Sequence, residues 1–458
     1  MEARTAPRQP DASPPSASSG LPPRPDLSNF MMSAGFMLTP TRFLDSCQKR
    51  CGDYFTLRPA PDRELVITAD PAAVKAVFTG DPNVLYAGEG NVTLAPLLGP
   101  GSVLLLDGAE HLRHRRLLLP PFHGERMRNY GEMMREVADR VIGEWPRARR
   151  FAALPSMQAI TLEIIMRAVF GFEDREQRER IGGPLRSLLD MVGSRPRVLA
   201  LALSAGRSGG PLSPWTRFAA ARSRADRLLF EEIRARRADP RVAEGADIFS
   251  MLLAARDPAG RPLTDVEVRD ELMTLLVAGH ETTATALAWA LERLTREPAV
   301  LATVLAERRD GGGEGDGDYL EAVVKETLRL RPVVPAVVRR LQAPMTFGGW
   351  ELPAGVNIAP SIYLLHRRGD LYPEPLAFRP ERFLGSDVPG TYEWIPFGGG
   401  VRRCLGASFA MFEMRVVLAA VLDGVRLRPS ASHRGEGVTR RAITFAPTRG
   451  ARLVADAT

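Results

Sequence analysis

The segment from Asp265 to Thr295 constrains the fold of this chain more than any other part of the sequence. Thr264 and Glu267 form a capping box at its start. Apolar residues then recur at helical spacing, at Leu272, Leu275, Leu276, Ala286 and Leu287. Because an α-helix rises 1.5 Å per residue, a helix of about 30 residues is about 45 Å long. We therefore expect one helix that crosses the whole molecule.

The middle of this helix is not uniformly apolar. It reads Ala278-Gly279-His280-Glu281-Thr282-Thr283. A glycine inside a helix costs about 1 kcal/mol relative to alanine, and threonine hydroxyls can bond back to carbonyls and bend the helix. The helix alone leaves two interpretations open. The segment is either a polar patch that faces the surface or a functional segment.

Cys404 lies in an unusual setting for a cysteine that only packs. The surrounding residues read Phe-Gly-Gly-Gly-Val-Arg-Arg-Cys-Leu-Gly over 397–406. Glycines allow the backbone to turn tightly or to approach a flat partner closely. A helical pattern runs from Leu405 toward Gly424, so we expect Cys404 just before a helix N-terminus. The exposed N–H groups and the dipole of that helix would favour a thiolate, which can ligate a metal.

Two kinds of metal group are excluded because their cysteine motifs are absent from the sequence. There is no Cys-x-x-Cys-His motif for covalent heme attachment and no cluster of cysteines for an iron–sulfur centre. A single thiolate in a glycine-lined loop, with Arg402 beside it for an anionic rim, suits one face of a non-covalently bound heme. The other two cysteines, Cys47 and Cys51, are four residues apart on a helical pattern. No second pair follows at zinc-site spacing, so we expect two ordinary thiols rather than a zinc site.

Composition places the chain among globular proteins. With three cysteines it does not resemble a disulfide framework, so we expect a reducing, cytoplasmic compartment. The N-terminus lacks a signal sequence, and the apolar stretch 30–38 is too short for a membrane span. The charge of +7 favours acidic partners, but no basic block with aromatic residues indicates nucleic acid. We expect a disordered Pro/Ser-rich tail at 1–27 and one domain at 28–458.

Other segments are less clearly marked. Residues Tyr54–Arg58 and Glu64–Thr68 are predicted to form two strands, followed by a helix from Pro71. Two regions rich in glycine and proline, 85–106 and 192–214, are predicted to be long irregular loops. The glycine and acid run 310–318 is predicted to be a solvated connection. Helical patterns dominate the remainder.

The pattern Phe397-x-x-Gly400-x-Arg402-x-Cys404-x-Gly406 resembles the heme-binding loop of the cytochrome P450 family. Two more segments match that family in order. Glu326-x-x-Arg329 is similar to its Glu-x-x-Arg helix, although an isolated pair of this kind is more often an exposed helix pair. Residues 380–383 are similar to the segment whose arginine, here Arg382, completes a buried ion-pair network. The resemblance covers residues 28–458.

The resemblance implies roles for the polar segment of the long helix. Residues 278–283 resemble the family's oxygen-activation segment, so Ala278 is expected beside the heme and Gly279 is expected to open the helix for dioxygen. Glu281 and Thr282 are expected to form an acid and alcohol pair that delivers protons. His280 is expected to be packed or orientational rather than a heme ligand.

The resemblance also implies ligands for the heme propionates. His111 and Arg115 match the family's propionate-binding helix, and Arg339 is a further candidate, with Arg340 adjoining it. Arg113 and Arg116 are expected to face solvent.

The resemblance implies a mainly α fold with smaller β-sheets, a single prism-shaped domain, and a monomer. Its cofactor is heme b with Cys404 as axial thiolate ligand. The implied reaction inserts one atom of dioxygen into a hydrophobic molecule such as a terpenoid, steroid, fatty acid or polyketide. Electrons are expected from a ferredoxin and its NAD(P)H-dependent reductase, docked near Arg403, Arg113 and Arg116. Expected substrate contacts are the 85–106 loop, the 185–215 region, Val277, Val333, Val334, Val337 and Ile443.

Three alternatives remain at this stage. The protein could use hydrogen peroxide directly as a peroxygenase, or rearrange a substrate without net oxygenation. It could also be a heme-thiolate sensor or binding protein without turnover. The Glu281 and Thr282 pair favours dioxygen use over the other two enzymatic reactions. It also argues against a sensor, because a sensor would not need proton delivery.

Overall fold

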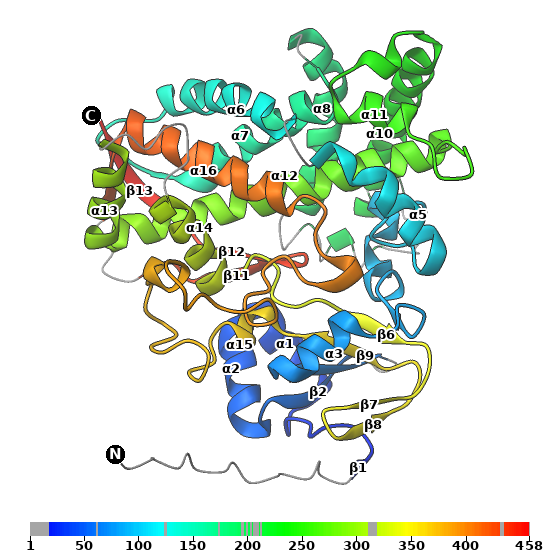
Figure 1. Cartoon of the computed structure of the whole chain (residues 1–458), viewed down its shortest axis with the longest axis vertical. Helices are drawn as coiled ribbons and strands as arrows, with labels where there is room; N and C mark the ends of the chain where they lie inside the picture. The colour runs from blue at the N-terminus through cyan, green and yellow to red at the C-terminus, as the bar shows by residue number, and fades with distance from the viewer. Residues whose placement is uncertain are drawn as a thin grey trace, which may run out of the picture.

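The structure is a computed structural model of the whole chain. It describes residues 18–60, 63–122, 126–172, 175–193, 197, 200–201, 204, 210, 213–309, 318–430 and 435–457. A larger, mainly helical part and a smaller part that holds most of the strands lie against each other (Figure 1). The mainly α fold with smaller sheets is as the sequence predicts.

Helix α12 (Asp265–Arg296) runs through the helical part, within one residue of the predicted end. The predicted capping box is present, since Thr264 accepts a hydrogen bond from the Glu267 N–H and the Glu267 carboxylate accepts one from the Thr264 N–H. Most of its residues are buried on every side, against α7 (Ala153–Ala168) and α16 (Ala407–Gly424) among others. In Figure 1 α16 passes in front of α12.

A five-stranded sheet with strand order β2-β3-β9-β6-β4 organises the smaller part. Both predicted strands are present with longer bounds, as β2 (Tyr54–Ala60) and β3 (Arg63–Thr68), which pair antiparallel. Helix α3 (Pro71–Thr79) begins at the predicted residue, where Asp70 caps it by accepting from the N–H groups of Ala72 and Ala73. Strand β9 (Asn357–Pro360) pairs parallel with β3, and β6 (Arg339–Leu341) joins β9 to β4 (Leu85–Tyr86).

The remaining elements complete the two parts. The other helices are α1 (Asn29–Leu38), α2 (Pro40–Cys51), α4 (Ala95–Leu98), α5 (Gly108–Leu118), α6 (Arg126–Gly143), α8 (Arg175–Val192), α10 (Pro214–Ala238), α11 (Ile248–Ala254), α13 (Pro298–Arg309), α14 (Asp318–Leu330) and α15 (Ile362–Leu365). The short 3₁₀ helices are η1 (Glu89–Leu94), η2 (Pro120–Phe122), η3 (Val242–Glu244), η4 (Pro380–Phe383) and η5 (Gly400–Arg402). The other strands are β1 (Ser18–Ser19), β5 (Arg150–Ala152), β7 (Met345–Phe347), β8 (Trp350–Leu352), β10 (Arg426–Pro429), β11 (Val438–Arg441), β12 (Thr444–Pro447) and β13 (Arg452–Asp456).

The predicted tail and loops differ from the structure in three places. Ordered contacts begin before residue 28, because β1 pairs with β8 and the carbonyls of Pro22 and Pro23 accept hydrogen bonds from Thr56. The region 85–106 is not an uncommitted loop, since it contains β4, η1 and α4. Most of 192–214 lies outside the described residues, but Arg197, Ala200, Leu201 and Ser204 are helical rather than irregular. Residues 1–17 and 310–317 also lie outside the described residues.

A buried ion pair lies on α14. The Glu326 and Arg329 side chains are both fully buried, and two nitrogens of the guanidinium donate to the two carboxylate oxygens at 2.6 and 2.7 Å. Arg329 also donates to the carbonyls of His366, Pro375 and Ala377, and Arg382 lies 3.5 Å from the Glu326 carboxylate. These bonds tie α14 to the irregular segment 366–382 that leads toward Cys404.

We expect Arg329→Met to lower the free energy of unfolding by about 3–5 kcal/mol, because it leaves a buried carboxylate without its main partner. Glu326→Leu combined with Arg329→Met should be less destabilised than the sum of the single variants. Urea unfolding measures all three. Lys325→Met is the matched control, since Lys325 and Glu321 form a part-exposed pair on the same helix, and its cost should stay below about 1 kcal/mol. Additive costs for the buried pair would contradict this account.

Candidate functional site

The loop that carries Cys404 is a tight turn before α16. Gly398 and Gly400 have φ angles of +66° and +64°, which residues with side chains rarely adopt. The Cys404 N–H donates to the carbonyl of Phe397 at 3.0 Å and closes the turn. Helix α16 begins at Ala407, two residues later than predicted, with Gly406 as its N-cap. Cys404 is therefore three residues from the helix rather than directly before it.

The glycines of the loop serve different purposes. A Cβ on Gly399 would lie 2.2 Å from the Phe78 ring, and one on Gly400 would lie 2.0 Å from the Phe78 carbonyl oxygen. These two glycines therefore allow α3 to approach the loop. By contrast, a Cβ on Gly406 would meet no atom of the described residues within 4 Å. Of these three positions, only Gly406 leaves room beside the loop for a flat partner.

The pKa of the Cys404 thiol differs from the sequence prediction. The side chain is exposed, but the protein around it is dense enough that desolvation raises the pKa. The Gly406 N–H, Arg115 and Arg403 act in the opposite direction without overcoming burial. The net shift of the Cys404 pKa is therefore opposite to the predicted one for the protein alone, although the Gly406 N–H acts in the predicted direction. A bound metal ion would supply the missing stabilisation, since coordination deprotonates a thiol.

Four cationic or titratable side chains converge near this loop from three elements. They are His111 and Arg115 on α5, Arg339 on β6, and Arg402 on η5. Burial, followed by the charges of Arg402, Arg115 and Arg339, lowers the pKa of His111 to about 3. Burial lowers the pKa of Arg339 and of Arg402 to about 10.

The cationic cluster has too little negative charge of its own. Among the described residues, Asp107 is the carboxylate that acts on it, through an ion pair with Arg402. Arg115 donates to the carbonyl of Arg403 at 2.7 Å, and Arg339 to that of Val338 at 2.8 Å. A group with two carboxylates would neutralise this surplus, so the residues present fit the rim of a heme and its two propionates.

Arg402 also fixes the segment before α5. Its guanidinium donates to the carbonyls of Val103 and Leu106 at 3.1 and 2.6 Å. Asp107 accepts from Arg402 and from the N–H groups of residues 87–89. The cofactor residue predicted from the sequence is therefore also the link between the cysteine loop and the 85–107 region.

The polar segment of α12 is not a surface patch. His280 and Thr283 are buried, while Ala278 is exposed in a helix that is otherwise mostly buried. Thr282 Oγ1 donates to the carbonyl of Ala278 at 2.5 Å, which is the backward bond expected of a helical threonine. An exposed alanine inside a core helix indicates that the helix borders an internal space there.

Gly279 and His280 face α7. A Cβ on Gly279 would lie 2.7 Å from Ile165 Cδ1, so the glycine allows the two helices to pack closely. The hydroxyl of Thr161 on α7 lies 2.9 Å from His280 Nδ1 and donates to the His280 carbonyl at 3.1 Å. Burial lowers the pKa of His280 to about 4, so it is neutral near pH 7. This geometry gives Gly279 a packing role that the sequence did not predict.

The Glu281 carboxylate has one hydrogen-bond partner and one ion-pair partner that the sequence did not predict. Gln158 Nε2 donates to one carboxylate oxygen at 2.6 Å, and Arg441 Nη1 lies 3.2 Å from the other. Gln158 is 123 residues away on α7 and Arg441 is 160 residues away on β11. Only the three-dimensional arrangement brings these groups together.

The predicted substrate residues lie on three separate segments. Val277 is partly exposed on α12, next to Ala278. Val333 is buried and its carbonyl accepts from the Phe445 N–H at 2.7 Å, which ties it to the hairpin of β11 and β12. Val334 and Val337 are partly buried, and Val337 Cγ1 lies 3.6 Å from the Cβ position of Gly398 in the cysteine loop. Ile443 is 46% exposed in the hairpin turn.

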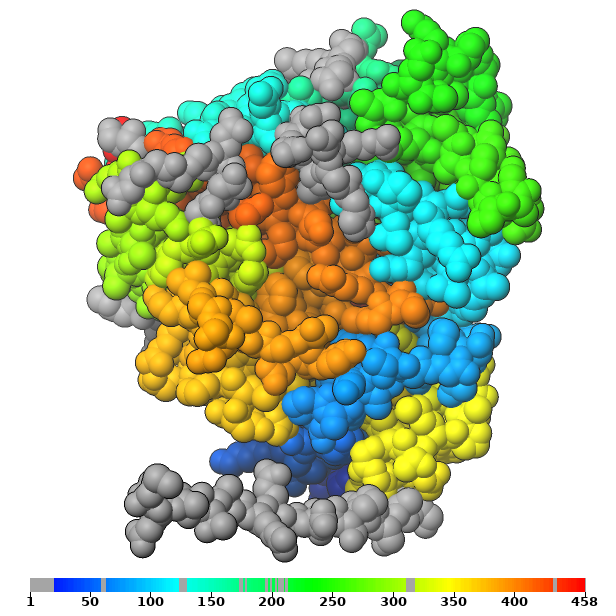
Figure 2. Space-filling model, viewed as in Figure 1, coloured from blue at the N-terminus to red at the C-terminus, as the bar shows by residue number. Residues whose placement is uncertain are grey.

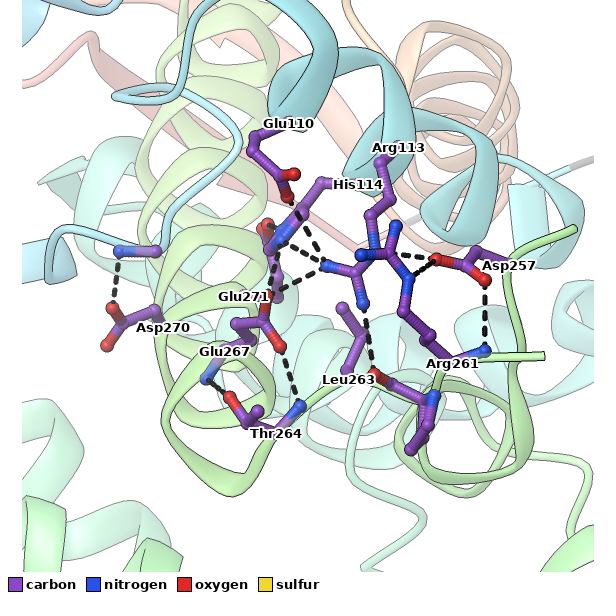
Figure 3. Close-up of polar contacts among 12 residues, drawn as sticks. Glu110, Arg113, His114, Asp257, Arg261, Leu263, Thr264, Glu267, Asp270 and Glu271 are labelled. Carbon is purple, nitrogen blue, oxygen red and sulfur yellow. Dashed lines mark hydrogen bonds and ion pairs between the residues drawn. The ribbon is translucent and has the colours of Figure 1, made fainter. Parts of the chain in front are cut away.

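Arg113 does not face solvent as predicted. Its side chain is 12% exposed, with Nε 3.0 Å from Asp257 and Nη1 2.9 Å from Glu267, and it donates to the Pro262 carbonyl (Figure 3). The segment 256–262 folds over α5, so a position that looked outward on the helix is covered. Arg116 is exposed, as predicted.

A buried pair of titratable groups lies beside Arg113. His114 Nδ1 is 2.7 Å from Glu271 Oε1, which also accepts from the Val103 N–H, and His114 Nε2 is 3.1 Å from Glu267 (Figure 3). Burial alone would lower the pKa of His114, but its bonds to Glu271 and Glu267 raise it. Burial raises the pKa of Glu271 to about 7. Glu110, His114 and Glu267 could together approach a metal ion, but Arg113 Nη1 already contacts all three.

The chain resembles known proteins along most of its length. The sequence profile of the cytochrome P450 family matches residues 22–437. A Mycobacterium tuberculosis protein with the provisional name cytochrome P450 135B1 is 45% identical over 444 residues, or 96% of this chain and 93% of the relative. Another from the same species, provisionally named cytochrome P450 135A1, is 39% identical, over 95% of each chain.

Solved structures show the same fold. The retinoic-acid-bound cyanobacterial CYP120A1 superposes with a TM-score of 0.83 at 24% identity, over 96% of this chain and 100% of that one. The cytochrome P450 CYP102L1 gives a TM-score of 0.82 at 25% identity, with the same coverage. Within the described residues, no helix combines the length and the apolar character that a membrane span requires.

The His114 and Glu271 pair predicts a pH dependence of stability. Both folded pKa values are raised, so the folded protein binds more protons than the unfolded chain above about pH 4.5. The stabilisation is complete at lower pH and is lost as pH rises through the folded pKa values. Between pH 5 and 8, wild-type protein should therefore lose stability relative to the variant His114→Gln/Glu271→Gln.

Chemical unfolding of both proteins at several pH values measures this difference. The comparison removes the opposite contributions of His111, His280 and His366, whose pKa values are lowered and which remain in both proteins. A difference that does not change with pH, or that grows as pH rises, would contradict the prediction.

Proposed function

This chain belongs to the cytochrome P450 family, and on that premise we propose that it is a monooxygenase that oxidises a hydrophobic small molecule. The proteins of this family carry heme b with a cysteine thiolate as axial ligand. In the proposed reaction, dioxygen, two electrons, two protons and substrate give hydroxylated or epoxidised product and one water. Bound heme supplies the iron that activates dioxygen. The protein side chains hold the cofactor, contact the substrate and deliver protons.

The observation that carries the proposal is the convergence of surplus positive charge beside Cys404. His111, Arg115, Arg339 and Arg402 would hold the two propionates, and Cys404 would ligate the iron. Phe397 and Gly400 shape the turn, and Gly406 leaves space beside it. No other group of the described residues combines an exposed thiol with buried cations in this way.

Proton delivery is proposed for Glu281 and Thr282. Glu281 is 25% exposed, so water reaches its carboxylate. Thr282 follows it directly on α12, and its hydroxyl already donates to the Ala278 carbonyl, which leaves its oxygen lone pairs able to accept a proton. Glu281 would take a proton from water and pass it toward Thr282, returning to its carboxylate form. The pair favours use of dioxygen over direct use of peroxide.

The substrate is proposed to be apolar, of the terpenoid, steroid, fatty acid or polyketide classes. The candidate contacts Val277, Val333, Val334, Val337 and Ile443 offer only hydrocarbon surface. The structural neighbour CYP120A1 binds retinoic acid, which is an apolar molecule with one carboxylate. That likeness supports an apolar substrate here without choosing among the classes.

Electrons are proposed to come from a small acidic ferredoxin and its reductase. The orange segment 385–424, which includes Cys404, reaches the surface in the middle of the face shown in Figure 2. Light-blue and cyan residues that include α5 border it. Arg116 and Arg403 are both exposed and can steer an acidic partner toward this face, whereas Arg113 is committed to internal ion pairs.

Replacing Cys404 tests the proposal. Wild-type protein, reduced and treated with carbon monoxide, should show the far red-shifted absorption band of a thiolate-bound heme. Cys404→Ala should lose this band and all product formation, because no thiolate remains to ligate iron. Cys51→Ala is the matched control and should keep both. A variant without Cys404 that keeps the band would rule out the proposed ligand.

Charge reversal at Arg116 tests the docking face. Stopped-flow reduction of Arg116→Glu by an acidic ferredoxin should be about 10-fold slower than wild type at low salt, and the difference should shrink as salt is raised. Heme content should not change. Arg63→Glu makes the same charge change at an exposed residue of β3, which pairs with β2 and β9 in the smaller part, and should leave the rate within about twofold. Equal rates for the two variants would exclude Arg116 from docking.

A further inference from the structure

Both oxygens of the Glu281 carboxylate are held by other side chains. Oε2 accepts from Gln158 Nε2 at 2.6 Å, and Oε1 faces Arg441 Nη1 at 3.2 Å. A glutamate has three rotatable side-chain bonds, so an unheld carboxylate beside a cavity would sample many positions. Two partners on separate elements restrict Glu281 to one.

Gln158 provides the rigid side of this arrangement. It lies on α7, three residues before Thr161, which bonds to the His280 ring and carbonyl. Gly279 allows α7 to approach at this same level of α12. Helix α7 is thus fixed against α12 at two consecutive residues, and Gln158 reaches the third, Glu281, from a backbone that has little freedom to move.

Arg441 provides the adjustable side. It pairs with Thr444 across the hairpin, and the Thr444 hydroxyl donates to the Arg441 carbonyl at 2.9 Å. Only Ala442 and Ile443 lie between them, and Ala442 has a φ of +47°, which is uncommon for a residue with a side chain. A displacement of this two-residue turn would therefore move Arg441 directly.

The hairpin also contacts the proposed substrate region. The Phe445 N–H donates to the Val333 carbonyl, and the Phe445 carbonyl accepts from Trp289 on α12 at 3.2 Å. Ile443 is 46% exposed at the tip. Phe445 on β12 is thus anchored through both its N–H and its carbonyl. The turn at 442–443, which directly follows Arg441, is the freer part of the hairpin.

We propose that Arg441 and Gln158 are positioning residues for Glu281, and that Arg441 links the hairpin turn at 442–443 to proton delivery. The inference rests on the proposed monooxygenase function. The two contacts fix the direction of the Glu281 carboxylate, so that a proton taken from water passes on to Thr282. A substrate that presses on Ile443 changes the Arg441 contact, so proton delivery depends on what occupies the site.

The neighbouring arginine provides a matched control. Arg440 lies on the same strand, but it donates to the Ala442 carbonyl, lies 3.4 Å from the sulfur of Met37, and stacks over the Phe36 ring. Arg440→Gln and Arg441→Gln therefore make the same chemical change on one strand. Only the second removes a contact with Glu281.

The test uses heme-loaded protein with a plant-type ferredoxin, its NADPH-dependent reductase and no added substrate. NADPH consumption is followed in H₂O and in D₂O. Arg441→Gln should slow consumption about 10-fold and enlarge the solvent isotope effect, because misplacing a catalytic group by about 1 Å can cost up to about 10²-fold. Arg441→Lys should restore much of the rate. Gln158→Leu should also slow NADPH consumption and enlarge the isotope effect. In a Glu281→Gln background, adding Arg441→Gln should change neither quantity further.

Hydrogen exchange gives a readout that does not depend on turnover. In Glu281→Gln, amides of residues 438–447 should exchange faster than in wild type, although the substitution is on α12. If reduced, heme-loaded wild-type protein shows no far red-shifted band with carbon monoxide, the monooxygenase proposal itself fails. If wild type is active and Arg441→Gln matches Arg440→Gln in rate and isotope effect, the positioning inference alone is overturned.

Discussion

The burial of charged side chains on α12 is the constraint on which the rest of the structure depends. Arg269, Asp270 and Glu271 lie in the core, where an unpaired charge is too costly to keep. Each has one partner on the segment 98–103, which donates from the Gly101 and Val103 N–H groups and accepts at the Leu98 carbonyl. Arg269 is also paired with Asp226 on α10, and Glu271 with His114 on α5. The helix therefore fixes the path of the chain that leads into α5, and through α5 it fixes His111 and Arg115.

Charge is also buried beside Cys404, but there the positive charges are not fully paired. Arg402 is held by three acceptors from the segment 103–107, and its charge adds to those of Arg115 and Arg339 around a neutral His111. On α12 the Asp226 and Asp270 carboxylates balance Arg269, whereas the cluster beside Cys404 keeps a surplus of positive charge. A dianionic cofactor rim would complete it, in which case heme binding would contribute to folding stability as well as to chemistry.

Local signals in the sequence predicted the local features well. The capping box at Thr264, the two strands before Pro71 and the turn around Cys404 each depend on neighbours within a few residues. The family resemblance predicted the network of Glu326, Arg329 and Arg382. Where no resemblance guided them, predictions that depended on distant partners were wrong or absent. Arg113 looked outward on its helix because nothing in the sequence shows that 256–262 folds over it. The raised pKa of Cys404 followed from burial by distant residues, which outweighs the helix terminus that the sequence does show.

The side chains of residues 279–282 on α12 point in different directions, and their roles differ accordingly. Gly279 and His280 resemble parts of a reactive segment, yet both face α7, where close packing and a bond to Thr161 account for them. Thr282 bonds to its own helix, and Glu281 reaches toward the hairpin. Successive helical residues differ by about 100° in direction, so one short motif serves a packing face and a chemical face at once. The Glu281 contacts belong to α7 and β11, so the proposed chemistry of the segment would depend on partners outside the motif, and these can differ between proteins that share it.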